Sequence, residues 1–245
     1  MRIQIKFRRL PVSKKTFKHF FVFAISCFIC SQAMGAFTLS GTRIIFPQGQ
    51  NTTSFEITNN AGQTYGGQVW VDNGDNSKGI YIIPQPAFFK VESGLKQMVR
   101  LIRTADARLP EDRESLFWLT VQEIPPVAKI AEGKNSGVTS VAMGTRVKVL
   151  YRPTSLKDGR KDAEKKMELV QDGQTSVLKN ATPYYMAVVG LRVDGRLLRM
   201  NRDIQRQLGS MAPFSEIRLG EKLNGKVTVE AIDDWGAVRS YTIRH

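Results

Sequence analysis

Hydrophobic and polar residues alternate along residues 138–153, which read VTSVAMGTRVKVLYRP. One parity is mostly apolar and the other largely polar: Val141, Met143, Val147, Val149 and Tyr151 against Ser140, Arg146 and Lys148. Period-two alternation rich in β-branched residues predicts a half-buried strand. At roughly 3.3 Å per residue it would span on the order of 50 Å, about two to three times an ordinary strand. We expect it to extend beyond its sheet and leave an apolar edge that another chain can join; the alternative is an ordinary central strand that happens to be long.

The same pattern predicts further short strands from residue 36 onward. Before the long strand we expect them at residues 37–46, 53–58, 68–71, 88–91, 97–103 and 115–124. After it the pattern is weaker and places them at residues 168–170, 184–191, 216–219, 226–232 and 238–243, with residues 197–208 as a helical turn or a loop. Polar turn clusters separate these segments and no long amphipathic helix is predicted, which favours an all-β sandwich fold.

Prolines and charged residues mark the expected domain boundary. Residues 127–137 follow a pair of prolines and are expected to form a mobile loop. Proline cannot continue a β-ladder, so Pro153 ends the long strand. We expect two β domains, at residues 36–152 and 154–245, with the charge run at residues 157–166 as a solvated linker or the first loop of the second domain.

The first 35 residues have the pattern of a secretory signal peptide. They contain seven basic residues and no acidic one, and an apolar run at residues 20–29 follows the basic start. Small residues at Ala33 and Gly35 place the cleavage site before Ala36. The apolar run is too short to span a bilayer, so we expect no stable membrane insertion; an uncleaved anchor is the alternative.

The location of the positive charge argues against nucleic-acid binding. The whole chain carries a formal net charge of +14. Without the leader, 29 basic residues face 22 acidic ones, and the excess falls to +7. A strongly basic domain would favour a nucleic-acid partner, but half of the excess here lies in the segment that export would remove.

Export would also remove most of the residue types that catalysis and metal binding use. Cys27, Cys30 and His19 lie in the leader, so the remaining chain has no cysteine and His245 as its only histidine. Apart from His245 it has no histidine for a nucleophilic triad, and it has no His/Cys metal cluster and no glycine-rich phosphate loop. We therefore expect no enzyme activity, no catalytic residue, no metal, no cofactor and no disulfide.

Several stretches resemble, in the right order, the periplasmic chaperones of the chaperone–usher pathway, the PapD-like proteins. The segment LPEDRESLFWLTVQEIPP at residues 109–126 is similar to the signature of that family. Other similar segments are TRIIF at residues 42–46, GLKQMVRL at 94–101, VKVLYRP at 147–153, NATPYY at 180–185 and DDWGA at 233–237. The resemblance covers essentially all of residues 36–243.

This resemblance implies a fold and a function. The fold would be two immunoglobulin-like sandwiches set at an angle with a cleft between them. The function would be that of a periplasmic chaperone which binds, folds and caps fimbrial subunits and delivers them to an outer-membrane usher without ATP. Such subunits lack the last strand of their sandwich, and the chaperone lends its own by strand addition. Thr139, Val141 and Met143 would then fill the groove of the subunit.

The resemblance also assigns two groups of charged residues. Arg43 and Lys148 match the cleft residues that anchor the C-terminal carboxylate of the subunit through charge-assisted hydrogen bonds. Lys148 has the opposite parity to Val141, so either the carboxylate lies beside the strand or Gly144 marks a bulge. A second group, comprising Glu114, Arg152 and Asp234, would hold the angle between the domains. As exposed ion pairs these would contribute only about 0–1 kcal/mol each.

Two other protein classes remain as alternatives. A fimbrial subunit or surface adhesin has a similar β build, but should lack the basic anchors and the second domain. A nucleic-acid-binding protein would show salt-dependent binding to DNA. Self-association of the free protein through its exposed strand is a further possibility that the pattern leaves open.

Overall fold

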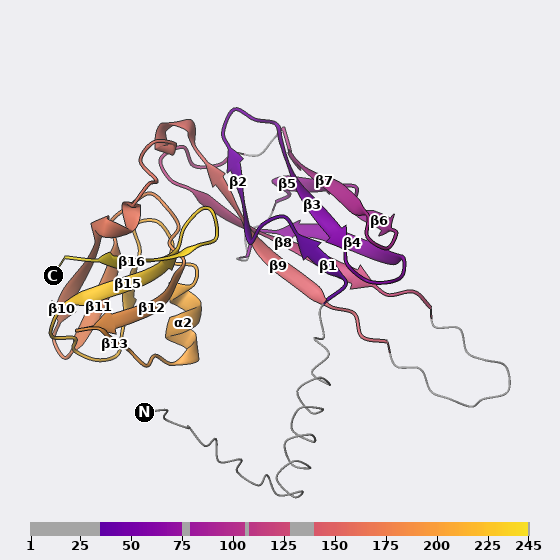
Figure 1. Cartoon of the computed structure of the whole chain (residues 1–245). Coiled ribbons are helices and arrows are strands. Elements are labelled where there is room, and N and C mark those ends of the chain that lie inside the picture. Colours follow the sequence, from indigo (N-terminus) through magenta and orange to yellow (C-terminus); the bar gives the residue numbers. More distant parts are fainter. Residues whose placement is uncertain (1–34, 75–78, 106–107, 128–139, 245) are drawn as a thin grey trace, which may run out of the picture. The chain divides into compact units, whose positions relative to one another are not determined.

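The computed structural model describes residues 35–74, 79–105, 108–127 and 140–244. Within these ranges the chain forms two β-sandwiches in succession, each with its own hydrophobic core. Figure 1 shows the strands of the first sandwich in indigo to magenta, with β9 in salmon, and those of the second in orange to yellow. The predicted all-β class with two sandwich domains is confirmed.

The first sandwich consists of two sheets. One has the order β1-β3-β7-β5, with β1 at Phe37–Leu39, β3 at Thr52–Asn59, β7 at Lys96–Arg103 and β5 at Ile82–Gln85. The other has the order β2-β9-β8-β4-β6, with β2 at Arg43–Pro47, β9 at Gly144–Arg152, β8 at Ser115–Ile124, β4 at Tyr65–Asp72 and β6 at Phe88–Val91. Alternate residues of both sheets face a common core that includes Phe46, Ile57, Leu101, Leu119 and Val149.

The prediction of a single strand at residues 37–46 is wrong, because the segment forms two strands that lie in different sheets. β1 pairs with β3 in the first sheet, whereas β2 pairs in parallel with β9 in the second. The break falls at Ser40-Gly41-Thr42, where small residues interrupt the apolar pattern. The chain therefore crosses from one sheet to the other just before Arg43.

The second sandwich is smaller than the first and contains helix α2. Its sheets have the orders β10-β11-β14 and β13-β12-β15-β16. The bounds are Met167–Asp172 for β10, Thr175–Asn180 for β11, Glu216–Arg218 for β14, Arg196–Leu197 for β13, Val188–Val193 for β12, Val227–Ile232 for β15 and Val238–Thr242 for β16. Helix α2 spans Arg202–Leu208, and the side chain of Asn201 caps it by accepting the N–H of Ile204 at 2.9 Å.

The charge run at residues 157–166 is not solvated throughout, so the prediction of a solvated linker is wrong. Ala163 belongs to the core of the second sandwich, which agrees with the alternative of a first loop of that domain. Short 3-10 helices occupy Thr154–Leu156 and Ala163–Lys166. Arg160 and Glu164 are buried and bind each other through two hydrogen bonds of 2.7 and 3.0 Å. A charge run of mixed sign can bury its members when they pair, which the sequence pattern does not reveal.

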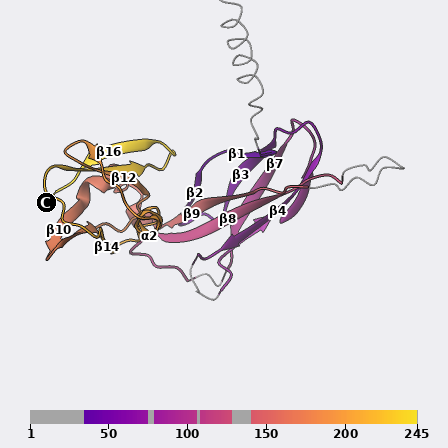
Figure 2. The same cartoon turned by 90° about the horizontal axis from the view of Figure 1, so that it is seen from below.

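Strand β9 is shorter than the predicted strand at residues 138–153. It begins at Gly144, and residues 140–143 precede it outside any strand; residues 138 and 139 lie outside the described ranges. Figure 2 shows β9 running alongside β8. The last β8 residue paired with β9 is Gln122, and the prolines at 125 and 126 stop the partner strand soon after. The ladder therefore ends before the apolar alternation does.

Candidate functional site

The two halves of β9 have different neighbours. Residues 148–152 pair in parallel with β2 on one side and, up to Tyr151, with antiparallel β8 on the other. Residues 144–147 pair with β8 alone among the described residues, because β2 begins only at Arg43, opposite Lys148. In the described part of the chain, no strand thus continues the line of β2 beside residues 144–147. A vacant sheet edge presents unpaired backbone N–H and C=O groups to another strand.

The four residues before β9, here called the edge segment (residues 140–143), carry apolar side chains at the surface. Val141 is 76% exposed and Met143 is 48% exposed. The carbonyl of Met143 accepts the backbone N–H of Glu123 at 2.9 Å, which ties the end of the segment to β8. Thr139, the third residue predicted to enter a groove, lies outside the described residues. The edge segment thus joins exposed apolar side chains to the vacant sheet edge.

The alternation in β9 places Lys148 on the face opposite the core. Val147 and Val149 are 7% and 0% exposed and belong to the core of the first sandwich. The register between β8 and β9 runs without a shift back to Gly144. The alternative in which Gly144 marks a bulge is therefore wrong, and Lys148 projects from the other face beside the vacant edge.

Arg43 and Lys148, here called the basic pair, are direct register partners in the parallel β2–β9 ladder. The resemblance assigned them together, and the structure brings them side by side although 105 positions separate them in sequence. Each donates to a carbonyl of the second sandwich: Arg43 Nη1 to Ile232 at 2.9 Å, and Lys148 Nζ to Gly209, which follows α2. Backbone carbonyls thus hold two like charges next to each other.

The basic pair is electrostatically unsatisfied. Burial, and then the neighbouring charge of Arg43, lowers the pKa of Lys148 to about 8. Burial also lowers the pKa of Arg43, although Asp234 partly offsets this. The Nε–H of Arg43 is buried and has no hydrogen-bond acceptor. Because a buried donor without a partner costs free energy, an anion at this position would stabilise both cations.

A cavity of about 630 Å³ opens beside Lys148. Its described lining includes the cations Arg146, Lys148 and Arg206 and contains no carboxylate residue. Trp118 forms part of the wall: the guanidinium of Arg146 lies 4.6 Å from its ring centroid and the ammonium of Lys148 lies 5.6 Å from it. Arg146 also forms an ion pair of 2.7 Å with Asp72. The cavity therefore suits an anionic group that reaches the basic pair.

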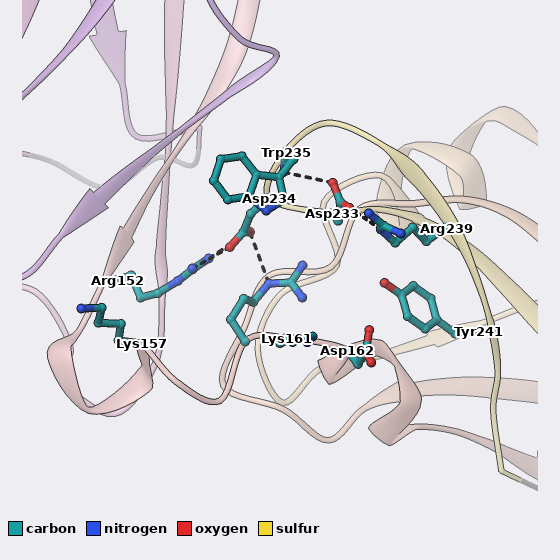
Figure 3. Close-up of a pocket in the computed structure, with 10 residues that line it drawn as sticks. Arg152, Lys157, Lys161, Asp162, Asp233, Asp234, Trp235, Arg239 and Tyr241 are labelled. Carbon is teal, nitrogen blue, oxygen red and sulfur yellow. Dashed lines mark hydrogen bonds and ion pairs between the residues drawn. The ribbon is translucent and has the colours of Figure 1, made fainter.

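The second predicted group is a buried charge network. Arg152 donates from Nε to Glu114 at 2.6 Å and from its two terminal nitrogens to Asp234 at 2.7 and 3.1 Å. Figure 3 shows the side chains of Arg152 and Asp234 pointing toward each other. Glu114 also accepts the backbone N–H of Tyr185 at 2.8 Å. The three residues join the end of β9 to the hairpin between β15 and β16.

The expectation that these pairs are exposed is wrong. The side chain of Glu114 is 0% exposed and that of Arg152 is 9% exposed. Burial raises the pKa of the Glu114 carboxyl, even though Arg152 acts in the opposite direction. Removing one member of a buried pair typically costs about 3–5 kcal/mol, because the other charge is left uncompensated. The network is therefore costly to break rather than nearly neutral.

Sequence reasoning missed Arg160, which extends the network. Its Nε lies 3.5 Å from Asp234, and both Arg160 and Arg152 lie within 6 Å of the ring centroid of Tyr184, at 5.7 and 5.8 Å. The i,i+4 spacing of Arg160 and Glu164 was the available signal, but that spacing is usually found on exposed helix surfaces.

Neither a metal centre nor a membrane-spanning helix is found in the part of the chain that the structure describes. No group of three or more histidine, cysteine, aspartate and glutamate side chains is arranged there to hold a metal ion. No described helix has the length and the hydropathy to cross a bilayer. The chemistry that the site does offer is strand pairing at an open edge and anion binding beside it.

Comparison with known proteins agrees with this geometry. Residues 36–157 match the family model of the pili and flagellar-assembly chaperone PapD N-terminal domain, and residues 162–243 match that of the pili assembly chaperone PapD C-terminal domain. The chaperone protein FanE of Escherichia coli is 42% identical over 89% of this chain and 94% of its own length. The chaperone protein FaeE of Escherichia coli is 34% identical, over 87% and 81% respectively.

The fold comparison leads to the same family. The crystal structure of the periplasmic chaperone SfaE superposes with a TM-score of 0.66 at 27% identity, covering 85% of this chain and 100% of that one. Both sandwiches match, which removes the alternative of a single-domain subunit or adhesin. The chain belongs to the PapD family of pilus-assembly chaperones.

Proposed function

We propose that the protein is a periplasmic chaperone that caps fimbrial subunits by lending them a strand and anchoring their C-terminal carboxylate. The observation that carries this proposal is the vacant edge of β9, which ends at the basic pair. A subunit strand that lies along residues 144–147 would continue the line of β2 and would end at Arg43 and Lys148. Its terminal carboxylate would then meet two desolvated cations.

The direction of the added strand follows from the same geometry. β2 runs parallel to β9 and begins at Arg43. A subunit strand whose last residue reaches Arg43 must approach along the edge segment, so it runs in the same direction as β9. Val141 and Met143 would enter the open groove of the subunit, where backbone hydrogen bonds give affinity and alternate side chains give register. The anchored carboxylate fixes that register, because a slip of one residue would move it away from the basic pair.

Delivery and location complete the proposal. The first 35 residues would direct export and be removed before Ala36, and the mature chaperone would pass its subunit to an outer-membrane usher. No nucleotide is required, because the usher-bound subunits supply the strand that replaces the lent one. The charge network would hold the two sandwiches so that the basic pair faces the bound strand.

A pull-down from the periplasm of the fimbriated host tests the proposal. Tagged mature protein is compared with Lys148→Ala and with Lys222→Ala, a control at an exposed lysine of the second sandwich. We expect small β-rich subunits, identified by mass, in stoichiometric amounts with the wild type and the control. Recovery with Lys148→Ala should fall at least about tenfold.

Two outcomes would contradict the proposal in different ways. Equal recovery with all three proteins would exclude Lys148 as an anchor while leaving strand addition intact. Recovery of no fimbrial subunit by the wild type from fimbriated cells would overturn the chaperone function itself. Arg43→Ala with the exposed Arg100→Ala as its control repeats the test for the other member of the basic pair.

A further inference from the structure

Three glutamate side chains are buried in the described chain, and one of them differs from the other two. Glu114, Glu123 and Glu164 are 2%, 5% and 0% exposed. Glu114 pairs with an arginine at 2.6 Å and Glu164 pairs with another at 2.7 Å. Glu123 has no cationic partner among the described residues. Buried carboxylates are normally paired with a cation, so a positive charge beside Glu123 would complete this site.

The carboxylate of Glu123 faces the start of the first sandwich. Its Oε1 accepts the backbone N–H of Phe37 at 2.7 Å. The nitrogen of Ala36 is three covalent bonds from that of Phe37, so the two lie within about 4 Å of each other. Ala36 is itself buried, at 6% exposed, and its carbonyl accepts the backbone N–H of Asn60 at 2.8 Å. The nitrogen of Ala36 is thus held close to the unpaired carboxylate.

We propose that Glu123 is the binding site for the α-ammonium group that cleavage creates at Ala36. Water adds across the Gly35–Ala36 peptide bond, leaving a carboxylate on Gly35 and a protonated amine on Ala36. The new cation arises beside a buried carboxylate that already accepts the neighbouring N–H. This inference rests on the proposed cleavage site and not on subunit binding.

The pair would link processing of the chain to the edge segment. The backbone N–H of Glu123 donates to the carbonyl of Met143 at 2.9 Å. One residue therefore holds the start of β1 through its side chain and the end of the edge segment through its backbone. An ammonium group that holds Glu123 in place would also hold Met143, the last residue of the edge segment. Removal of the leader would therefore stabilise the position of the edge segment.

A double comparison of the purified protein tests the pairing. Protein exported with its own leader is compared with protein that retains a Gly-Ser extension before Ala36, each with Glu123 and with Glu123→Gln. The exposed Glu92→Gln serves as the matched control in the same sandwich. We expect the extension to lower the thermal unfolding midpoint by about 3–8 °C when Glu123 or the control is present, and by less than about 1 °C in Glu123→Gln. An equal loss in every background would overturn the proposal.

Two further measurements do not depend on any variant. The intact mass of the exported protein must correspond to a start at Ala36, and any other start overturns the proposal without touching the chaperone function. The α-amine of the folded wild type should be acylated at least about tenfold more slowly at neutral pH than that of the same chain in urea, because the paired ammonium is held protonated and buried. Equal rates would show that the amine is free.

Discussion

The two halves of β9 are built from similar residues but face different surroundings. Residues 148–151 have a strand on each side and contribute Val149 and Tyr151 to the core. Residues 144–147 have one neighbour among the described residues, and the edge segment before them exposes Val141 and Met143. The same apolar alternation therefore stabilises the fold in one half and leaves apolar side chains exposed in the other. The difference is set by where β2 begins.

The largest expected effect lies at the paired end of β9. Arg152→Ala leaves the buried Glu114 carboxylate without its cation, so we expect the free energy of unfolding to fall by about 3–5 kcal/mol. Urea denaturation of the mature protein measures this change. Arg100→Ala, at an exposed position on β7, should change it by less than about 0.5 kcal/mol. A loss below about 1 kcal/mol for Arg152→Ala would mean that the network is solvated in solution.

Substitution of one valine in the paired half of β9 and of one in the edge segment tests their different roles directly. Val149→Ala removes two methyl groups from a fully buried position, and we expect it to lower the free energy of unfolding by about 2 kcal/mol without weakening subunit capture. Val141→Ala should leave stability within about 0.5 kcal/mol and weaken subunit capture. The two variants are measured by urea denaturation and by the periplasmic pull-down. If both valines affected the same property, the division of β9 into a core half and a binding half would be wrong.

The smallest effect on subunit capture is a pH dependence of the affinity, which arises at Lys148, the first residue of the paired half. The pKa of Lys148 is lowered to about 8. Above that pH the free chaperone loses the ammonium, and we expect subunit affinity to fall by up to about tenfold per pH unit. Titration calorimetry of wild type and Lys148→Arg with a purified subunit between pH 7 and about 9.5 measures this, and the arginine variant should show a flat profile. A wild-type profile as flat as that of the variant would contradict the lowered pKa.

The stability of the free protein should change in the opposite direction over the same range. An unfolded lysine titrates near 10.4. Between about pH 8 and that value the unfolded state binds more protons than the folded state at Lys148, so stability rises with pH. Comparison with Lys148→Met by urea denaturation isolates this contribution, since the methionine side chain does not titrate. A constant difference between the two proteins would show that Lys148 titrates normally.

Elements with regular alternation and proline stops were predictable from the sequence, and elements without them were not. Residues 88–91 and 115–124 agree with β6 and β8. β11 was missed because three consecutive residues, Ser176, Val177 and Leu178, are buried and hide the period of two. β5 was missed because Pro84 interrupts its short apolar run. Local pattern thus identifies strands with one buried face better than strands buried on both.

The candidate site depends on contacts that no local pattern contains. The register of β2 against β9 joins residues distant in sequence, and only the family resemblance paired Arg43 with Lys148. The burial of Arg160 and Glu164 follows from packing against the second sandwich and looks, in sequence, like a solvated charge run. Glu123 carried no sequence signal, because its lack of a cation appears only once its surroundings are known.

The parallel alignment of β2 and β9 has a consequence for how long a guest strand stays. A strand that follows the line of β2 in the same direction forms a parallel ladder with β9. Parallel pairing is slightly less stable per residue than antiparallel pairing. A competing strand that entered the groove of the subunit in the opposite direction would therefore form the more stable ladder, so its replacement of the lent strand would be favourable. The position and direction of β2, a strand of five residues, would therefore make the complex with a subunit temporary.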